Sequence, residues 1–388
     1  MSRTRSPIRR RRVLVLILAV FGLVAVVPVV SLSAALAAPG NTTATERAVE
    51  WVRDHGGGGL VNTAENWWFS NNGPKQGGQP DHGITFDPMP GSGSSTTPSS
   101  ASGPATTPHP ADIVTPAGQS LANEGVWQPV GPLVAGGQAM YATQVRPDSV
   151  HTSLLDGLVW MDPKLVRFDL HPGIQEPGGP WQAPTQVPPS QRLDLLAAFN
   201  GGFRMQDANG GFYLEGHAQK PLRDGAASFV VHGDGTATVG QWGRDISMSP
   251  AVVAVRQNLQ LIVDNGQPVA GLDDNADGKW GSTLGNRVLV WRSAVCVVDN
   301  GGIIYGYGNG LGAQSLATLM QRAGCRRAME LDINPSWTTF NLYGAATPGD
   351  SASVAGTKLL PDQNKGGNRY LSNDSRDFIA VLARRQGQ

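Results

Sequence analysis

Two closely spaced carboxylates are the residues of this sequence best suited to acid–base chemistry. Glu330, Asp332 and Asn334 alternate with apolar residues at the end of an expected strand over residues 328–333. Because side chains alternate across a strand, the three polar residues would share one face. Neighbouring carboxylates push their pKa values apart, which would give one acid and one base. The alternative is a rim position at which both carboxylates make ordinary solvated ion pairs.

A second constellation follows the continuous apolar run from Leu193 to Phe199, which is typical of a buried central strand. Asn200, Gly201 and Gly202 come directly after it. Two glycines let the backbone approach a ligand closely, and the asparagine amide both donates and accepts hydrogen bonds. We therefore predict that these three residues bind substrate, with a plain glycine turn as the alternative.

One segment has the spacing of a calcium loop. Asp273, Asn275 and Asp277 match its first three oxygen ligands, but Leu284 stands where the bidentate glutamate belongs. A polar turn is the alternative. The 7 histidines are scattered, without the spacing of a zinc pair on a helix. We therefore expect no cofactor.

The segment from Gly308 to Ala313 has the G-x-G-x-x-A spacing of a dinucleotide-binding turn, and Asp332 lies about where a ribose-binding acid would fall. The neighbouring expected strands come as hairpins, however, whereas a dinucleotide fold needs parallel strands. A nucleotide-binding βαβ unit is therefore the third choice of function.

The elements that must position these residues are mostly short strands. Alternation predicts a half-buried strand over residues 166–170, and a His-Gly-Asp-Gly turn predicts a hairpin of 228–231 with 236–239. Further strands are expected over residues 252–255 paired with 259–263, and over 288–291, 294–298, 303–307 and 378–382. Leu316, Leu319, Met320 and Ala323 line one face of a helix that Gly324 ends. Many hairpins with one or two packed helices predict an α+β domain built on antiparallel sheet.

Residues 1–40 have the order of an export segment. Six arginines precede the apolar run from Val13 to Val27, and the small-residue stretch that follows contains Ala35-Leu36-Ala37. This order fits a cleaved signal peptide, and the length of the run also fits an uncleaved membrane anchor. Both readings place the rest of the chain outside the cytoplasmic membrane. A cleaved segment would leave the protein secreted, and an uncleaved segment would anchor it to the membrane. Outside the cytoplasm Cys296 and Cys325 could pair, or they could remain two buried thiols.

Three regions follow the export segment. In residues 41–87 a capping box at Thr43 and Glu46 starts a short helix, which four glycines from Gly56 should end. Residues 88–113 are rich in Ser, Thr, Pro and Gly, as in a disordered linker. Residues 114–388 form the main domain. The net charge of zero, with no basic patch, argues against a nucleic-acid partner.

Taken together, the motifs resemble the phosphodiester glycosidase family over roughly Gln191 to Leu382. The family's N-G-G-F is similar to residues 200–203, its R-T-A-I-G to residues 292–296, and its L-D-G-G-G-S-S-T to residues 331–338. The stretch from Gly125 onward also resembles an actinobacterial-type exported branch of that family.

The resemblance implies hydrolysis of a sugar joined through its anomeric carbon to a phosphodiester, with a sugar phosphodiester or cell-envelope saccharide as the partner. It implies that Arg292 binds phosphate in bidentate fashion, that Asp332 is the acid/base or binds sugar hydroxyls with Glu330 as its partner, and that Asn200 and Ser336 position the ligand. The family's three glycines are replaced by Ile333-Asn334-Pro335. A non-catalytic glycan-binding or envelope module on the same fold is therefore the alternative function.

Overall fold

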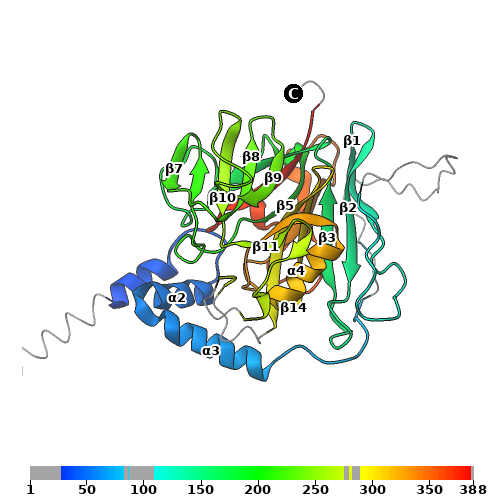
Figure 1. Ribbon diagram of the computed structural model, residues 1–388. Helices are drawn as coiled ribbons and strands as arrows, with labels where there is room; N and C mark the ends of the chain where they lie inside the picture. The colour runs from blue at the N-terminus through cyan, green and yellow to red at the C-terminus, as the bar shows by residue number, and fades with distance from the viewer. Residues whose placement is uncertain (1–27, 83–85, 87–108, 275–278, 282–288, 386–388) are drawn as a thin grey trace, which may run out of the picture. The chain divides into compact units, whose positions relative to one another are not determined.

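The computed structural model describes residues 28–82, 86, 109–274, 279–281 and 289–385, and the chain divides into two units at residues 64 and 65 (Figure 1). Of the expected export segment, residues 1–27 lie outside the described residues, and residues 28–36 are helical. Most of the expected linker, residues 88–108, also lies outside them. Within the described ranges, no helix has the length and apolar character required to cross a bilayer.

The capping box of the N-terminal unit forms as the sequence predicts. Helix α2 (Ala44–Val52) begins after Thr43, whose hydroxyl accepts from the Glu46 N–H at 3.2 Å while the Glu46 carboxylate accepts from the Thr43 N–H at 2.8 Å. The glycines were expected to end the helical region, and this is wrong. Only Gly56 takes a positive φ, of 85°, in the kinked segment Arg53–Gly57, and helix α3 (Gly58–Asn71) follows at once. Glycine costs a helix only about 1 kcal/mol, so the glycines make a kink rather than an end.

The main unit is built from three β-sheets in which all pairings between neighbouring strands are antiparallel (Figure 1). The first sheet has the order β1 (Gln128–Val134), β2 (Gly137–Val145), β3 (Asp156–Met161), β14 (Ile303–Leu311), β13 (Val290–Val298), β15 (Cys325–Glu330), β11 (Leu261–Asp264) and β12 (Gln267–Pro268). The second has the order β7 (His217–Lys220), β6 (Phe212–Leu214), β10 (Val252–Gln257), β8 (Ala227–His232) and β9 (Ala237–Gln241). The third has the order β17 (Val354–Lys358), β16 (Phe340–Ala345), β5 (Leu195–Asn200), β18 (Phe378–Ala383) and β4 (Val166–His171).

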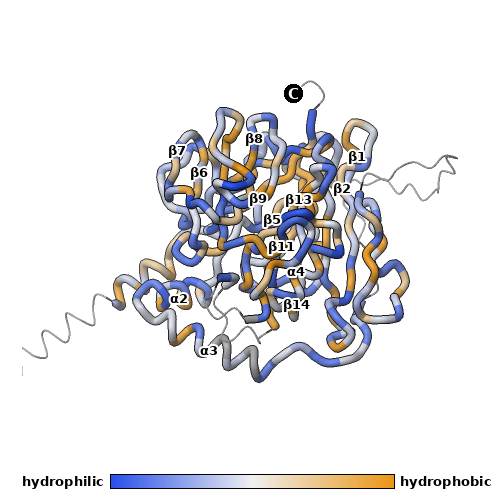
Figure 2. Tube along the Cα trace, viewed as in Figure 1, coloured by the Kyte–Doolittle hydropathy of each residue, from blue (hydrophilic) through white to orange (hydrophobic). Residues whose placement is uncertain are grey.

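One helix, α4 (Ala313–Arg322), packs on strands β11, β13, β14 and β15 of the first sheet. Its buried face is the expected one, and Gly324 follows it with a φ of +84°. The other face of this sheet meets both five-stranded sheets in one apolar core. The hydrophobic colour of Figure 2 accordingly gathers along interior strands such as β5 and β13. The predicted α+β class is confirmed.

Local patterns predicted most strands correctly, but one strand pairing is wrong. Strand β4 shows the expected alternation, β5 is buried throughout, and β8 and β9 form the expected hairpin. The segments 252–255 and 259–263 were expected to pair. Instead β10 pairs with β6 and β8, while β11 crosses into the first sheet and pairs with β12 and β15. A turn between two strands therefore does not decide whether they belong to the same sheet.

The dinucleotide reading does not fit the strand arrangement. Gly308 and Gly310 lie inside strand β14, and β13 runs antiparallel between β14 and β15. A dinucleotide turn instead connects adjacent parallel strands through a helix. Glycine is needed at position 308 for another reason, because a Cβ there would lie 1.8 Å from the Asp156 carboxylate.

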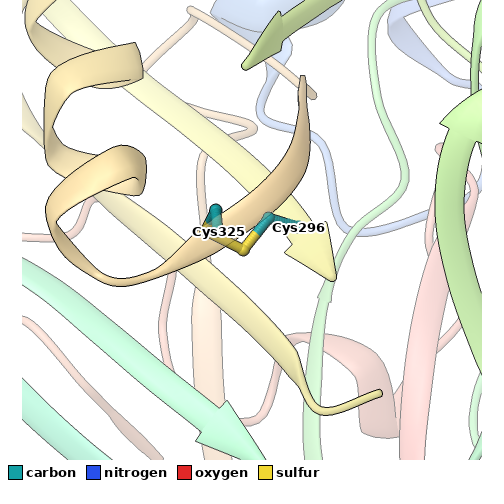
Figure 3. Close-up of a disulfide and its surroundings, with 2 residues drawn as sticks. All are labelled: Cys296 and Cys325. Carbon is teal, nitrogen blue, oxygen red and sulfur yellow. A yellow bond between two sulfur atoms is a disulfide. The ribbon is translucent and has the colours of Figure 1, made fainter. Parts of the chain in front are cut away.

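A disulfide between Cys296 and Cys325 joins β13 to the start of β15, just after α4 (Figure 3). The two residues are 29 positions apart. Because the bond closes this loop in the unfolded chain, we expect the double variant Cys296→Ser with Cys325→Ser to lose about 2–4 kcal/mol of unfolding free energy. Urea unfolding of both proteins, with the reduced wild type as control, measures this loss. An unchanged midpoint would show that the bond adds no stability.

Candidate functional site

Strand β15 ends at Glu330, before the expected end at residue 333. Asp332 therefore lies just beyond the strand. The backbone still pairs with β13 for one more step, because Leu331 N–H donates to the Ser293 carbonyl at 2.8 Å and Ser293 N–H to the Asp332 carbonyl at 2.9 Å. The chain then turns away. Strand alternation therefore does not place Glu330, Asp332 and Asn334 on one face.

The Asp332 carboxylate holds the turn that follows. Its Oδ1 accepts from the N–H groups of Ile333 at 2.8 Å and Asn334 at 2.9 Å. Its Oδ2 accepts no hydrogen bond from the described residues, which leaves this oxygen to exchange a proton. The Asn334 side chain accepts in turn from Ser336 N–H at 2.9 Å. Residues 333–336 are half-buried, so Ser336 lies at the surface beside the buried carboxylate.

Asn200, at the end of β5, is held by protein groups. Its Nδ2 donates to Ser293 Oγ at 3.2 Å, and its Oδ1 accepts from Tyr305 OH at 2.7 Å and from Thr339 N–H at 3.3 Å. Since Ser293 is also bonded to the backbone of Asp332, the structure brings Asn200 and Asp332 together.

Gly201 and Gly202 make room for a buried ion pair. Arg256 Nε donates to Asp377 Oδ2 at 2.7 Å, and both side chains are 0% exposed. A Cβ on Gly201 would lie 2.0 Å from that oxygen, and a Cβ on Gly202 would lie 3.2 Å from the Arg256 guanidinium. The sequence predicted that a ligand would approach the backbone at the two glycines. In the structure the protein's own Asp377 and Arg256 side chains lie there.

Asn258 joins this loop to the end of β15. Its Oδ1 accepts from Phe203 N–H at 3.2 Å, while its Nδ2 donates to the carbonyls of Glu330 at 2.6 Å and Leu331 at 3.1 Å. One buried amide therefore fixes the glycine loop against the backbone that leads to Asp332.

Positive charge reaches Asp332 from the segment before β18 and from the turn at residues 369–371. Burial raises the pKa of Asp332 to about 6, and Arg376, then hydrogen bonds from Asn334 and Ile333, then Arg369 act against that rise. The Arg376 guanidinium lies over the Trp337 ring, 4.4 Å from its centre, and Arg369 lies over the same ring at 5.2 Å. A carboxyl that titrates near pH 6 beside cations is suited to acid–base work.

Arg292 and Glu330 form a separate buried pair. Arg292 NH1 donates to Glu330 Oε1 at 2.5 Å, and both side chains are 0% exposed. Arg292 also donates to the carbonyls of Leu311 and Trp280. Because successive side chains of a strand point to opposite faces, Arg292 faces α4 while Ser293 faces Asn200. The structure therefore does not bring the Arg292 side chain to Asn200, where a shared phosphate site was expected.

Glu330 titrates near neutrality inside this pair. Burial raises its pKa to about 7, with Arg292 acting against the rise and Asp332 adding to it. Glu330 Oε2 and Arg292 NH2 are buried and have no hydrogen-bond partner among the described residues. Glu330 is the last residue of β15, two positions before Asp332, so the pair anchors the strand end that leads to Asp332.

The raised pKa of Asp332 predicts a pH-dependent stability. Its carboxyl binds a proton more tightly in the folded protein, with a pKa of about 6, than at its usual value of 3.8. The unfolding free energy therefore falls as the pH rises through this window, and it stays lower above it. We expect Asp332→Asn to remove this loss and to be more stable than wild type by up to about 3 kcal/mol at pH 7.5 but not at pH 4. Urea unfolding at both pH values measures the difference, and a gain equal at both would contradict the assignment.

The expected calcium loop is only partly described. Asp273 lies in the short helix Leu272–Asp274 and is exposed, whereas Asn275 and Asp277 lie outside the described residues. In the part of the chain that the structure covers, no group of three or more His, Cys, Asp or Glu side chains could hold a metal ion.

Four residues of the site were not identified from the sequence. They are Arg256, Asn258, Arg376 and Asp377. Each belongs to a polar run beside apolar strand residues. The runs are Arg256-Gln257-Asn258 at the end of β10 and Asp374-Ser375-Arg376-Asp377 directly before β18. Runs of polar residues beside apolar strands are therefore the sequence pattern from which these four residues could have been predicted.

Comparison with known proteins finds that part of this chain is similar to one protein family. Residues 194–356 match the model of the phosphodiester glycosidase family. This range holds Asn200, Arg292, Asp332 and Ser336. The comparison with curated proteins found no match.

Three solved structures are similar to this chain. The catalytic domain of zebrafish N-acetylglucosamine-1-phosphodiester alpha-N-acetylglucosaminidase, auto-inhibited by its pro-peptide, is 12% identical, with 72% of this chain and 97% of that chain covered and a TM-score of 0.40. A hypothetical protein from Synechocystis is 14% identical, with 65% and 64% covered and a TM-score of 0.37. A protein of Burkholderia pseudomallei described as exported is 14% identical, with 59% and 74% covered and a TM-score of 0.30.

Proposed function

We propose that this chain, whose residues 194–356 match the model of the phosphodiester glycosidase family, is an exported hydrolase that releases a sugar from a sugar-1-phosphodiester or a related cell-envelope glycan. The observation that carries this proposal is Asp332, a buried carboxyl with a pKa of about 6 and one oxygen without a hydrogen bond from the described residues. Glycosidic cleavage through an oxocarbenium-like transition state uses such a carboxyl.

In this proposal Asp332 Oδ2 exchanges the proton. Its Oδ1 is bound to two backbone N–H groups, which hold the carboxyl in place while the other oxygen reacts. Near pH 6 the group is present in both protonation states, so it can give a proton to the leaving oxygen or take one from water.

Arg376 is the cation that we assign to the phosphate, in place of Arg292. Among the cations, Arg376 acts most strongly on Asp332, whereas Arg292 is fully buried and paired with Glu330. We expect Arg376→Lys to raise KM more than it lowers kcat, because an ammonium cannot make the bidentate contact of a guanidinium with phosphate. Steady-state kinetics on a sugar-1-phosphodiester measure both constants. An unchanged KM would remove Arg376 from this role.

The proposed location of the protein is outside the cytoplasm. It is supported by the disulfide between Cys296 and Cys325, since disulfides persist in oxidising compartments and are rare in the cytosol. The arginine-rich start followed by an apolar run is the sequence support for it. Fractionation of cells that produce the full chain tests it, and recovery in the cytosol would contradict it.

A non-catalytic glycan-binding module is the second candidate. The N–H groups of Ile333 and Asn334 are bound to Asp332, and Pro335 has no N–H, so this turn offers no free amide to a phosphate from its first three residues. The purified chain should release free sugar from a panel of alpha-linked sugar-1-phosphodiesters. If it binds envelope glycan but releases no sugar from any of them, the module is the function and the hydrolase proposal fails.

A further inference from the structure

A second carboxylate lies beside Arg376. Glu176 belongs to the segment between β4 and β5, and this segment runs along the residues that precede β18. The N–H groups of Gln175 and Glu176 both donate to the Ser375 carbonyl, at 3.1 Å each. A Cβ on Gly173 would lie 2.4 Å from the carbonyl carbon of Arg376, so the two segments are in direct contact. The backbone therefore places Glu176 next to the arginine that we assign to the phosphate.

The Glu176 carboxylate is held in the same way as that of Asp332. Its Oε2 accepts from the Met205 N–H at 3.0 Å, and its Oε1 accepts no hydrogen bond from the described residues. Asp332 likewise has one oxygen bound to backbone N–H groups and one that accepts none from the described part of the chain. Glu176 is half-buried, so part of its side chain stays open to solvent. Each carboxylate is thus fixed by one oxygen while the other is left to react.

The guanidinium of Arg376 acts on both carboxyls. Burial raises the pKa of Glu176, and the Met205 N–H and then Arg376 act against that rise. Among the cations, Arg376 also acts most strongly on Asp332. The two carboxyls therefore lie around one guanidinium. A raised pKa makes the Glu176 carboxylate a stronger base than an exposed glutamate, which suits it to accept a proton.

The other carboxylates of this region are occupied by arginines. Asp374 accepts from Arg369 Nε at 2.6 Å and from Arg369 NH2 at 3.1 Å. Asp377 belongs to the buried ion pair beside the two glycines. Glu176 and Asp332 each keep an oxygen that accepts from no described residue. They are therefore the two carboxylates around Arg376 that can take part in a reaction.

The glycine loop, residues 200–205, connects Glu176 with the backbone that leads to Asp332. Its Met205 N–H donates to Glu176, and its Phe203 N–H donates to Asn258. Asn258 in turn donates to the last two carbonyls before Asp332. Two residues of extended chain span at most about 7 Å, so the two contacts of the loop are close together. The two carboxyls thus belong to one site.

We propose that Glu176 is the second reacting carboxylate of the proposed hydrolysis, on which this inference rests. Glycosidases that invert the anomeric carbon use one carboxyl to protonate the leaving oxygen and a second to take a proton from water. In this site the water oxygen bonds to the anomeric carbon while its proton passes to Glu176. The bond from that carbon to the phosphate oxygen breaks, its electron pair leaves with the phosphate monoester, and Asp332 protonates that oxygen.

The test is Glu176→Gln in the full chain, assayed on an alpha-linked sugar-1-phosphodiester. Glutamine keeps the shape and an oxygen for the Met205 N–H, but it cannot take a proton from water. We expect kcat to fall by about 10²–10⁴-fold, with KM little changed. Sodium azide attacks without a base, so we expect it to restore turnover in Glu176→Ala as a glycosyl azide. NMR of the wild-type reaction should show the beta anomer as the first sugar formed.

Glu215→Gln is the matched control. The Glu215 carboxylate accepts from the N–H groups of Gln182 at 3.1 Å and Ala183 at 2.6 Å, so it holds the same segment that contains Glu176. Glu215 is exposed, at the turn between β6 and β7. The same substitution there removes a charge and weakens a hold on this segment, and it should leave kcat unchanged.

Four outcomes would overturn the inference. They are an unchanged kcat in Glu176→Gln, a change in KM alone, no rescue of Glu176→Ala by azide, and release of the alpha anomer, which requires a nucleophile in place of a base. Sugar release that falls in Asp332→Asn but not in Glu176→Gln rejects this inference alone. If the wild type releases no sugar from any sugar-1-phosphodiester, the proposed function fails and this inference fails with it.

Discussion

Asp332→Asn is expected to lower sugar release from an alpha-linked sugar-1-phosphodiester by about 10²–10⁴-fold, the usual contribution of a general acid or base. Asparagine keeps the shape of the side chain, and its amide oxygen can still accept from the N–H groups of Ile333 and Asn334. It cannot carry a charge or move a proton at the second position. The loss should therefore appear in kcat, and measurement of free sugar against time gives it.

Asp299→Asn is the matched control for this change. The Asp299 side chain is 84% exposed, and its only described partner is Arg326, at 3.4 Å. Replacement of aspartate by asparagine at this position removes the same negative charge and should leave the rate of sugar release unchanged. If Asp332→Asn keeps the wild-type kcat, Asp332 is not the acid or base. If it changes KM alone, Asp332 binds the sugar hydroxyls.

The elements that the sequence predicts correctly are those that depend on local patterns. The alternation in β4, the apolar run of β5, the turn between β8 and β9 and the apolar face of α4 are each contained in about ten consecutive residues. Each pattern decides which side chains are buried, and burial of apolar side chains is the main stabilising contribution to folding.

The errors concern partners that are distant in the sequence. Strands β10 and β11 are neighbours along the chain but belong to different sheets, because β11 pairs with β15, whose partner residues lie 65 and 68 positions later. Two short strands were expected over residues 288–298, and the structure has the single strand β13. Arg292 and Ser293 interrupt the apolar pattern there, but their polar atoms are bonded to residues of other strands.

The candidate site shows the same division. Asp332 and Asn200 were predicted as site residues because each follows an apolar strand in a segment that resembles a motif of a known family. The Arg256 and Asp377 pair was not identified, because its members are 121 residues apart and neither belongs to a motif. A sequence shows that a polar residue lies beside an apolar run, but it does not show which partner makes its burial stable.

That buried pair carries the second large prediction. We expect Asp377→Asn and Arg256→Met each to lose about 3–5 kcal/mol of unfolding free energy, because each change leaves an unpaired polar or charged group in the core. Both side chains are 0% exposed, and Arg256 also donates to the carbonyls of Phe203 and Gln257. Urea unfolding of each variant measures the loss.

The double variant separates the ion pair from the packing around it. Once Asp377→Asn has removed the charge, Arg256→Met should cost less than it does in wild type, since no carboxylate is then left unpaired. The exposed pair of Arg326 and Asp299, 3.4 Å apart, is the control, and its coupling should stay below about 1 kcal/mol. If the two single losses at Arg256 and Asp377 simply add in the double variant, the pair is not coupled. The glycine loop would then be held by the hydrogen bonds of Asn258 and not by this charge pair, because Asn258 is the other side chain that binds the backbone of Phe203.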